Sequence, residues 1–245
     1  MNHKIIDINV DAGEGIGNES QLMPYIASCN IACGGHAGDE NSIRTCLRLC
    51  KKHETLAGAH PGLPGNFGRG ASLPTPTEFQ SLLHHQWSLI SSIAHEEKIP
   101  LHHIKLHGRL YSAVEENAEL REVFLNFLKS LEFPLACFAL ASGCLPEAGK
   151  ARGLEVWPEA FADRTYQDDG SLPPRTQPGA VLDQPPAIRD RIQHWLQSGT
   201  IPARSGKLIQ LKAKTLCIHS DSPGVLATIE LLNQLRRSLP NSELG

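Results

Sequence analysis

Two short segments, residues 6–11 and 103–107, have one wholly polar face each, and they constrain the fold more than any other feature. Apolar and polar residues alternate strictly in both segments, and a period of two predicts β-strands. The polar faces carry Asp7, Asn9 and Asp11 in the first segment and His103, Lys105 and His107 in the second. An open sheet covered on both sides would have difficulty satisfying these groups, so the pattern favours a fold that encloses a polar space.

Short apolar segments alternate with longer amphipathic ones along the whole chain. We expect strands at residues 5–11, 29–33, 55–59, 101–107, 134–140, 154–161 and 214–219. We expect helices at residues 19–27, 41–53, 77–98, 115–131, 145–152, 187–197 and 224–239, with Asp39 as the cap of the second. Residues 203–211 are predicted to form an extra hairpin, and the long loop 162–186 is predicted to be a lid or a binding loop.

Seven such β-α units predict a parallel sheet with helices outside it, either open or closed into a barrel. An open sheet gathers ligand groups at its switch point, whereas a barrel collects them at the carboxyl ends of several strands. Asp11, His36, His60, His107 and His219 end or follow five separate predicted strands. We therefore predict a single (β/α) barrel domain over residues 1–245, with about seven parallel strands and a polar interior.

The composition excludes several classes of protein. The 245 residues are 40% hydrophobic and 20% charged, which is typical of a globular domain, and the net charge of −3 does not favour a nucleic-acid partner. Because Asp7 and Asp11 interrupt the first apolar run, we expect neither a signal peptide nor a membrane span. The seven cysteines have no zinc-ribbon spacing. We expect Cys29, Cys33, Cys46 and Cys50 to be buried as small hydrophobic residues, and a reducing cytoplasm fits the sequence best.

Four of the twelve histidines, His36, His60, His107 and His219, lie at the ends of predicted strands. A single buried histidine is usually a hydrogen-bonded structural residue, but a barrel would bring these four to one rim. With Asp11, His36 and His60 make a carboxylate and imidazole set that suits a divalent metal. No HExxH motif or paired Cys/His spacing accompanies this set, so the metal prediction depends on inferred geometry alone.

Lys105 has two interpretations. A lysine directed into a barrel needs a carboxylate partner, and Asp11 and Glu14 are the candidates. In the first interpretation its charge stabilises an oxyanion or a phosphate, and in the second it forms a buried ion pair that stabilises the barrel. The two neighbouring acids also allow a division into a general acid and a general base.

Common nucleotide-binding and nucleophile motifs are missing from the sequence. Ser205-Gly206-Lys207 lacks the first glycine and the final hydroxyl of a phosphate-binding loop, and the glycines at 13, 15 and 17 do not form GxGxxG. There is also no GxSxG elbow and no local nucleophile signature around a cysteine. The sequence therefore favours neither a P-loop nucleotide site nor acyl-enzyme chemistry.

Eight motifs follow one another over nearly the whole length of the chain. They are DAGEG at 11–15, NIACGGHAGD at 30–39, GAHP at 58–61, NFGR at 66–69, KLHG at 105–108, FADR at 161–164, DGSL at 169–172 and CIH at 217–219. In these motifs the chain resembles the LamB/YcsF family, the A subunit of bacterial 5-oxoprolinase. The resemblance implies a barrel related to those of the polysaccharide deacetylases and glycoside hydrolases. It also implies ATP-dependent opening of 5-oxo-L-proline to L-glutamate, together with partner subunits B and C.

The implied reaction assigns roles to the residues at the strand ends. An unstrained lactam is a poor electrophile, so ATP is expected to activate its amide oxygen before a deprotonated water attacks. Asp11 or Glu14 would act as the base, and Lys105 and His107 would stabilise the anion. The side chains expected to bind substrate are Asn9, His36, His60, Arg69, Asp163, Arg164, Arg175 and His219, with one of the arginines on the substrate carboxylate.

Because no phosphate loop is present, ATP is expected to be bound mainly by the partner subunits. Two other functions stay open from the sequence. The first is a metal-dependent deacetylase or another amidohydrolase on the same barrel. The second is a non-catalytic scaffold that completes the site of subunits B and C. The oligomeric state also stays open, a homo-oligomer included.

Overall fold

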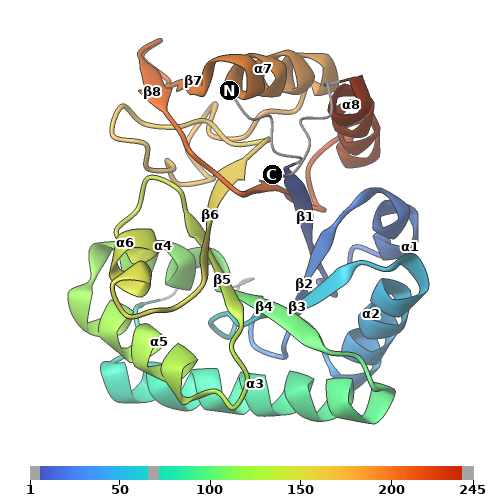
Figure 1. The fold of residues 1–245 in the computed structure, drawn as a ribbon, viewed down its shortest axis with the longest axis vertical. Coiled ribbons are helices and arrows are strands. Elements are labelled where there is room, and N and C mark those ends of the chain that lie inside the picture. Colours follow the sequence, from blue (N-terminus) through green and yellow to red (C-terminus); the bar gives the residue numbers. More distant parts are fainter. Residues whose placement is uncertain (1–5, 66–71, 239–245) are drawn as a thin grey trace.

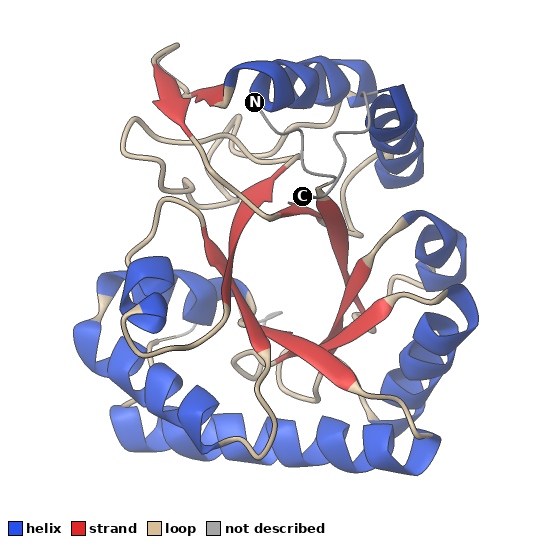
Figure 2. Cartoon of the chain, in the orientation of Figure 1, coloured by secondary structure: helices blue, strands red, loops and turns tan. Residues whose placement is uncertain are grey.

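The computed structural model describes residues 6–65 and 72–238, and its centre is a closed barrel of seven parallel strands (Figure 2). The strands are β1 Asp7–Ala12, β2 Ser28–Ala32, β3 Leu56–His60, β4 Leu101–Lys105, β5 Ala136–Leu140, β6 Val156–Phe161 and β9 Thr215–Ile218. Each of the first six pairs with the next along the chain, and β9 pairs with both β6 and β1 to close the barrel. The predicted (β/α) barrel is confirmed.

Helices surround the barrel on the outside (Figure 1). They are α1 Glu19–Leu22 with the short 3₁₀ helix η1 Met23–Tyr25, α2 Glu40–His53, α3 Pro76–Glu97, α4 Gly108–Glu116, α5 Ala118–Ser130, α6 Leu145–Lys150, α7 Pro185–Ser198 and α8 Val225–Ser238. The antiparallel strands β7 Thr200–Pro202 and β8 Leu208–Gln210 form the predicted extra hairpin outside the barrel. Among these described helices, none is long and apolar enough to cross a membrane.

One predicted helix, residues 115–131, is in fact two. Helix α4 already begins at Gly108, after the two residues that follow β4, and Asn117 has an extended backbone with φ of −116° between α4 and α5. The Asn117 side chain accepts hydrogen bonds from the backbone N–H groups of Glu119 and Leu120, so it caps the second helix. The predicted cap of α2 is confirmed, because the carboxylate of Asp39 accepts from the backbone N–H of Ser42 at 2.8 Å.

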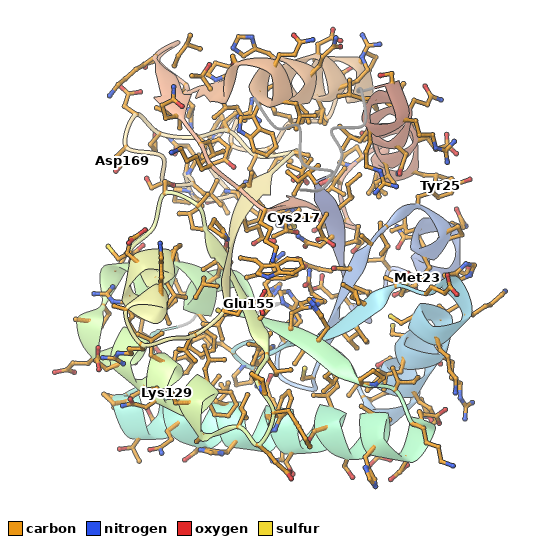
Figure 3. All side chains as sticks on the ribbon, in the orientation of Figure 1. Met23, Tyr25, Lys129, Glu155, Asp169 and Cys217 are labelled. Carbon is orange, nitrogen blue, oxygen red and sulfur yellow. The ribbon has the colours of Figure 1, made fainter. Side chains whose placement is uncertain are left out.

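The alternation in β1 separates an apolar surface from a polar one. Ile8 and Val10 are buried in the apolar layer between the barrel and its helices, whereas Asn9 is directed into the barrel. There the Asn9 amide donates to Glu159 Oε1 at 2.9 Å and to Thr215 Oγ1 at 2.7 Å, from the strands β6 and β9. Side chains fill the enclosed space, with Cys217 near its centre (Figure 3). The polar face predicted for the first strand therefore faces inward.

Candidate active site

Most of the predicted site residues that the structure describes lie at or just after the carboxyl ends of the barrel strands, where backbone conformation determines how they project. The turn after β1 contains Gly13 and Gly15 with φ of +74° and +80°, a left-handed conformation that favours glycine. This turn places Glu14 next to loops that follow β2 and β4. Lys105 ends β4, and His219 directly follows β9.

Lys105 is buried in the barrel among negatively charged groups. Its Nζ donates to Asp11 Oδ1 at 2.9 Å and lies 3.2 Å from Glu159 Oε1 and 3.0 Å from Cys217 Sγ. Burial opposes the charge, but the electrostatic interactions with Asp11 and Glu159 and the contact with the Cys217 sulfur outweigh it and raise the pKa of Lys105 well above its ordinary value. Lys105 is therefore an ammonium, and Asp11 is its partner, as predicted; the other candidate partner, Glu14, instead faces three histidines.

Glu159 was not among the predicted site residues. It is fully buried on β6, where its Oε1 accepts from Asn9 and its Oε2 accepts from the Tyr111 hydroxyl at 2.7 Å. A charged residue inside the otherwise apolar segment 156–161 is the signal that would have indicated it.

A layer of amides lies beneath Asp11. The Asn30 side chain donates to Asp11 Oδ1 and to Asn9 Oδ1, both at 2.8 Å, and its own oxygen is 2.8 Å from His103 Nε2. Because an amide oxygen only accepts, His103 Nε2 carries the proton in this contact. These bonds satisfy buried polar groups that would otherwise destabilise the barrel.

Four residues, Glu14, His36, His60 and His107, form what we call the histidine cluster. Glu14 Oε1 lies 3.0 Å from His36 Nε2, 3.3 Å from His107 Nδ1 and 3.8 Å from His60 Nε2, and His107 Nδ1 lies 3.0 Å from His60 Nε2. The rings of His36 and His107 stack in parallel with centroids 3.6 Å apart. Two of the three predicted metal ligands, His36 and His60, are thus in this cluster.

The third predicted metal ligand, Asp11, lies beside the histidine cluster. Its Oδ2 is 3.5 Å from His60 Nε2, while its Oδ1 is bonded to Lys105 and Asn30. Burial raises the pKa of Asp11, but the charges of His60 and Lys105 outweigh it and hold this pKa well below its ordinary value. Asp11 is therefore a stable carboxylate.

Burial also determines the charge states within the histidine cluster. It lowers the pKa of His36 to about 4, and it lowers the pKa of His107, so both rings are neutral at pH 7. Burial raises the pKa of Glu14, but hydrogen bonds with His107 and His36 outweigh it and hold the pKa well below its usual range. The cluster combines the carboxylate of Glu14 with the neutral imidazoles of His36 and His107 and a third imidazole, His60, the donor types that a divalent transition metal prefers.

Asp163 and His219 form a second pair at the same end of the barrel. His219 Nδ1 lies 3.1 Å from both carboxylate oxygens of Asp163, and the Ser222 hydroxyl donates to the same carboxylate. Burial raises the pKa of Asp163, but the charge and hydrogen bond of His219 and the bond from Ser222 lower it to about 2. With Nδ1–H donated to Asp163, the Nε2 of a neutral His219 carries the lone pair.

The three predicted carboxylate-binding arginines differ in their surroundings. Arg164 is buried, and its guanidinium donates to the backbone oxygens of Ala180 and Pro173, so it stabilises the loop after β6. Arg175 lies on the same loop, is partly exposed, and pairs with Asp221 at 2.8 Å. Arg69 lies outside the described residues. Of the two described arginines, Arg175 is the better placed to bind an anion.

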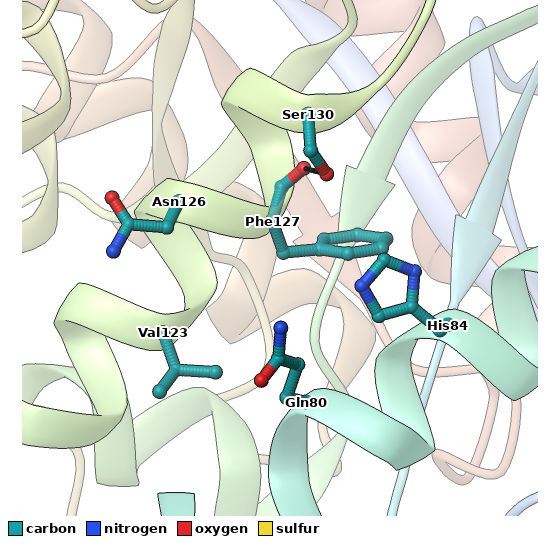
Figure 4. A pocket seen from close by; sticks show the side chains of 6 residues that line it. All are labelled: Gln80, His84, Val123, Asn126, Phe127 and Ser130. Carbon is teal, nitrogen blue, oxygen red and sulfur yellow. Dashed lines mark hydrogen bonds between the residues drawn. The ribbon is translucent and has the colours of Figure 1, made fainter. Parts of the chain in front are cut away.

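A surface pocket lies between α3 and α5, away from the strand ends. Its lining residues are Gln80, His84, Val123, Asn126, Phe127 and Ser130 (Figure 4). None of these six is a predicted site residue, and His84 contacts Phe127 edge to face. The pocket therefore contributes no functional group to the site.

The sequence profile of the LamB/YcsF family matches residues 6–244. The chain belongs to the LamB/YcsF family. One relative, the A subunit of 5-oxoprolinase from Limosilactobacillus fermentum, is 37% identical over 236 residues, which are 94% of each chain. Another, the A subunit of 5-oxoprolinase from Shouchella clausii, is 38% identical and covers 93% of this chain and 92% of its own length.

A crystal structure named lactam utilization protein, from Thermus thermophilus, has the same fold as this LamB/YcsF chain. It superimposes with a TM-score of 0.86 at 33% sequence identity, over 96% of this chain and 97% of the other. The predicted family is therefore confirmed over nearly the whole chain, at the level of both sequence and fold.

Proposed function

We propose that this chain is the A subunit of an ATP-dependent 5-oxoprolinase, which opens the lactam of 5-oxo-L-proline to L-glutamate. The relatives named as A subunits of 5-oxoprolinase and the structure named lactam utilization protein support this assignment. The observation that carries it in this chain is the Asp163–His219 pair, which supplies an oriented imidazole at the end of the barrel.

His219 is the general base in this proposal. Asp11 and Glu14 have pKa values held low by their surroundings, and a carboxylate of low pKa is a weak base. An imidazole whose Nδ1–H is donated to a carboxylate is the common solution at neutral pH. The Nε2 of His219 takes a proton from the attacking water while the water oxygen bonds to the activated lactam carbon. The C–N bond of this adduct then breaks, and its nitrogen takes the proton held by His219 to become the amine. A second water displaces the phosphoryl group that ATP placed on the amide oxygen, which gives phosphate and the carboxylate of L-glutamate.

Lys105 and Asp11 act as positioning residues. Asp11, Glu159 and Cys217 surround the Lys105 ammonium, and its side chain is only 3% exposed. This environment favours the interpretation of Lys105 as a buried ion pair over that of a group touching an oxyanion. Arg175 is the residue we assign to the substrate carboxylate, because a guanidinium can form two parallel hydrogen bonds with it.

Subunits B and C are the proposed partners, and they are expected to bind most of the ATP. The test is a reconstitution in which this chain, alone or with B and C, is given 5-oxo-L-proline with or without ATP, and glutamate and ADP are measured. We expect turnover only in the complex with ATP. Glutamate release by the chain alone would contradict the assignment of ATP binding to subunits B and C. An assembled but inactive complex would contradict the proposed reaction.

A non-catalytic role for this chain is tested in the same complex. The His219→Asn variant keeps a polar side chain but removes the base, so the proposal expects a large loss of turnover. His85→Asn, on the exposed surface of α3, is the matched control. Full turnover by an assembled His219→Asn complex would assign the chemistry to the partners.

A further inference from the structure

We propose that Glu14, His36, His60 and His107 bind one divalent transition-metal ion of the zinc type. The site belongs to this chain alone, so the inference does not depend on the proposed lactam chemistry.

The distances within the histidine cluster suit one small ion. One ligand atom from each of the four residues lies within 4.8 Å of the other three. Zinc binds nitrogen and oxygen ligands at about 2.0–2.1 Å in a tetrahedron, which separates the ligands from one another by about 3.3 Å. The contacts of Glu14 Oε1 with the three rings, 3.0, 3.3 and 3.8 Å, lie on both sides of that value.

His60 is oriented as metal-binding histidines usually are. Its Nδ1 lies 2.8 Å from the backbone oxygen of Lys105, and since a carbonyl only accepts, Nδ1 carries the proton. A neutral His60 therefore has its lone pair on Nε2, the atom directed at Glu14 and His107. A hydrogen bond from the outer nitrogen to a backbone carbonyl fixes both the tautomer and the ring orientation of such ligands.

His36 and His107 are brought together by a glycine. A Cβ atom at Gly62 would lie 2.3 Å from His36 Nδ1 and 3.0 Å from His107 Cβ, so only glycine allows this approach. The buried side chain of Gln86 fixes Gly62 on both sides, accepting from its N–H at 3.0 Å and donating to its oxygen at 2.8 Å. The two stacked rings are therefore pre-positioned, which is what a metal site requires.

The local charge also favours a dication. Three acidic side chains, Asp11, Glu14 and Glu159, lie around the three imidazoles, and Lys105 is the one lysine that contacts two of them. Acidic groups therefore outnumber the lysine here, which favours binding of a cation. Buried charge without compensation is strongly unfavourable, so the ion would stabilise the end of the barrel.

The experiment measures binding by the chain alone, without ATP, lactam or partners. The purified chain is treated with a chelator, dialysed, and titrated with ZnCl₂ in a calorimeter and with CoCl₂ in a spectrophotometer. We expect one ion per chain, a higher Tm with zinc, and the visible bands of four- or five-coordinate Co²⁺ without a thiolate charge-transfer band. Such a band would assign the ion instead to Asp11, Cys217 and His219, the other described group of suitable ligands, and would overturn the proposal.

Two variants test the ligands separately from folding. Glu14→Gln is nearly isosteric and His36→Ala removes a ring, and each is expected to weaken zinc binding by about 100-fold or more, beyond the usual loss from a supporting residue. His85→Ala on the exposed surface of α3 is the control and should bind as the unmodified chain does. Circular dichroism of the metal-free variants shows whether they fold. Zinc binding that is undetectable in the unmodified chain, or unchanged in a folded Glu14→Gln, would overturn the site.

Discussion

Nζ of Lys105 lies 2.9 Å from Oδ1 of Asp11 inside the barrel, although the two residues come from strands that are not neighbours in it. Neither charge is exposed to solvent enough for water to replace the contact. The ion pair therefore stabilises the barrel at the end that carries the candidate site. Its removal should lower the free energy of unfolding.

Lys105→Ala is expected to destabilise the protein. The substitution leaves Asp11 and Glu159 buried without a positive partner, which typically costs about 3–5 kcal/mol in the free energy of unfolding. Denaturant unfolding monitored by circular dichroism measures the change. Lys52→Ala on the exposed surface of α2 is the control, with an expected change below about 0.5 kcal/mol. An unfolding curve for Lys105→Ala that matches the unmodified chain would show that the pair is not stabilising.

His219→Asn is expected to lower glutamate formation by the complex about 10²–10⁴-fold, the usual contribution of a general base. The fold should persist, because His219 is partly exposed and follows β9. Turnover is compared with that of the His85→Asn complex, and the Tm of both variants is measured. A loss of less than about tenfold would assign the base to another residue.

The free energy of unfolding should fall in acid, because the carboxylate of Asp163 becomes protonated there. Its pKa is lowered from 3.8 to about 2 in the folded chain, so the unfolded chain binds more protons between these values. The contribution, about 2 kcal/mol, is complete above pH 4 and is lost as the pH falls toward 2. Asp163→Asn should remove this part of the pH dependence. The free energy of unfolding, measured at pH 6 and pH 3, tests this expectation. An equal decrease between the two pH values in the unmodified chain and in Asp163→Asn would contradict it.

Gly62→Ala is expected to separate His36 from His107. The new methyl group would be 2.3 Å from His36 Nδ1, so a ring must move, at a typical cost of about 1–3 kcal/mol. Both the affinity for zinc and the stability of the fold should therefore fall in this variant. Gly153→Ala is the comparison, because Gly153 has φ of +74° but no neighbouring atom within 4 Å of an added Cβ. Unchanged zinc binding by Gly62→Ala would show that the ring stacking is not required.

Local patterns were sufficient to predict the barrel and the end of it that carries the site. Alternation in residues 6–11 and 103–107 depends only on neighbouring residues, so it appears in the sequence before any tertiary contact exists. The carboxyl ends of parallel strands necessarily meet at one rim, which is why His60, His107 and His219 were correctly grouped. The need of Lys105 for an anionic partner, with Asp11 and Glu14 as the two candidates, followed from the same reasoning, since a buried cation requires an anion.

The sequence by itself determined the seven strands, the inward polar faces and the family, because these depend on short periodic patterns and ordered motifs. Only the tertiary structure decided which polar groups meet. Asn9 bonds to Glu159, 150 residues away, because β9 lies between β1 and β6 and closes the barrel. It likewise decided that Glu14 faces three histidines rather than Lys105, and that Gly62 brings His36 against His107. Such contacts depend on strand register and loop path in three dimensions, which spacing along the chain does not encode.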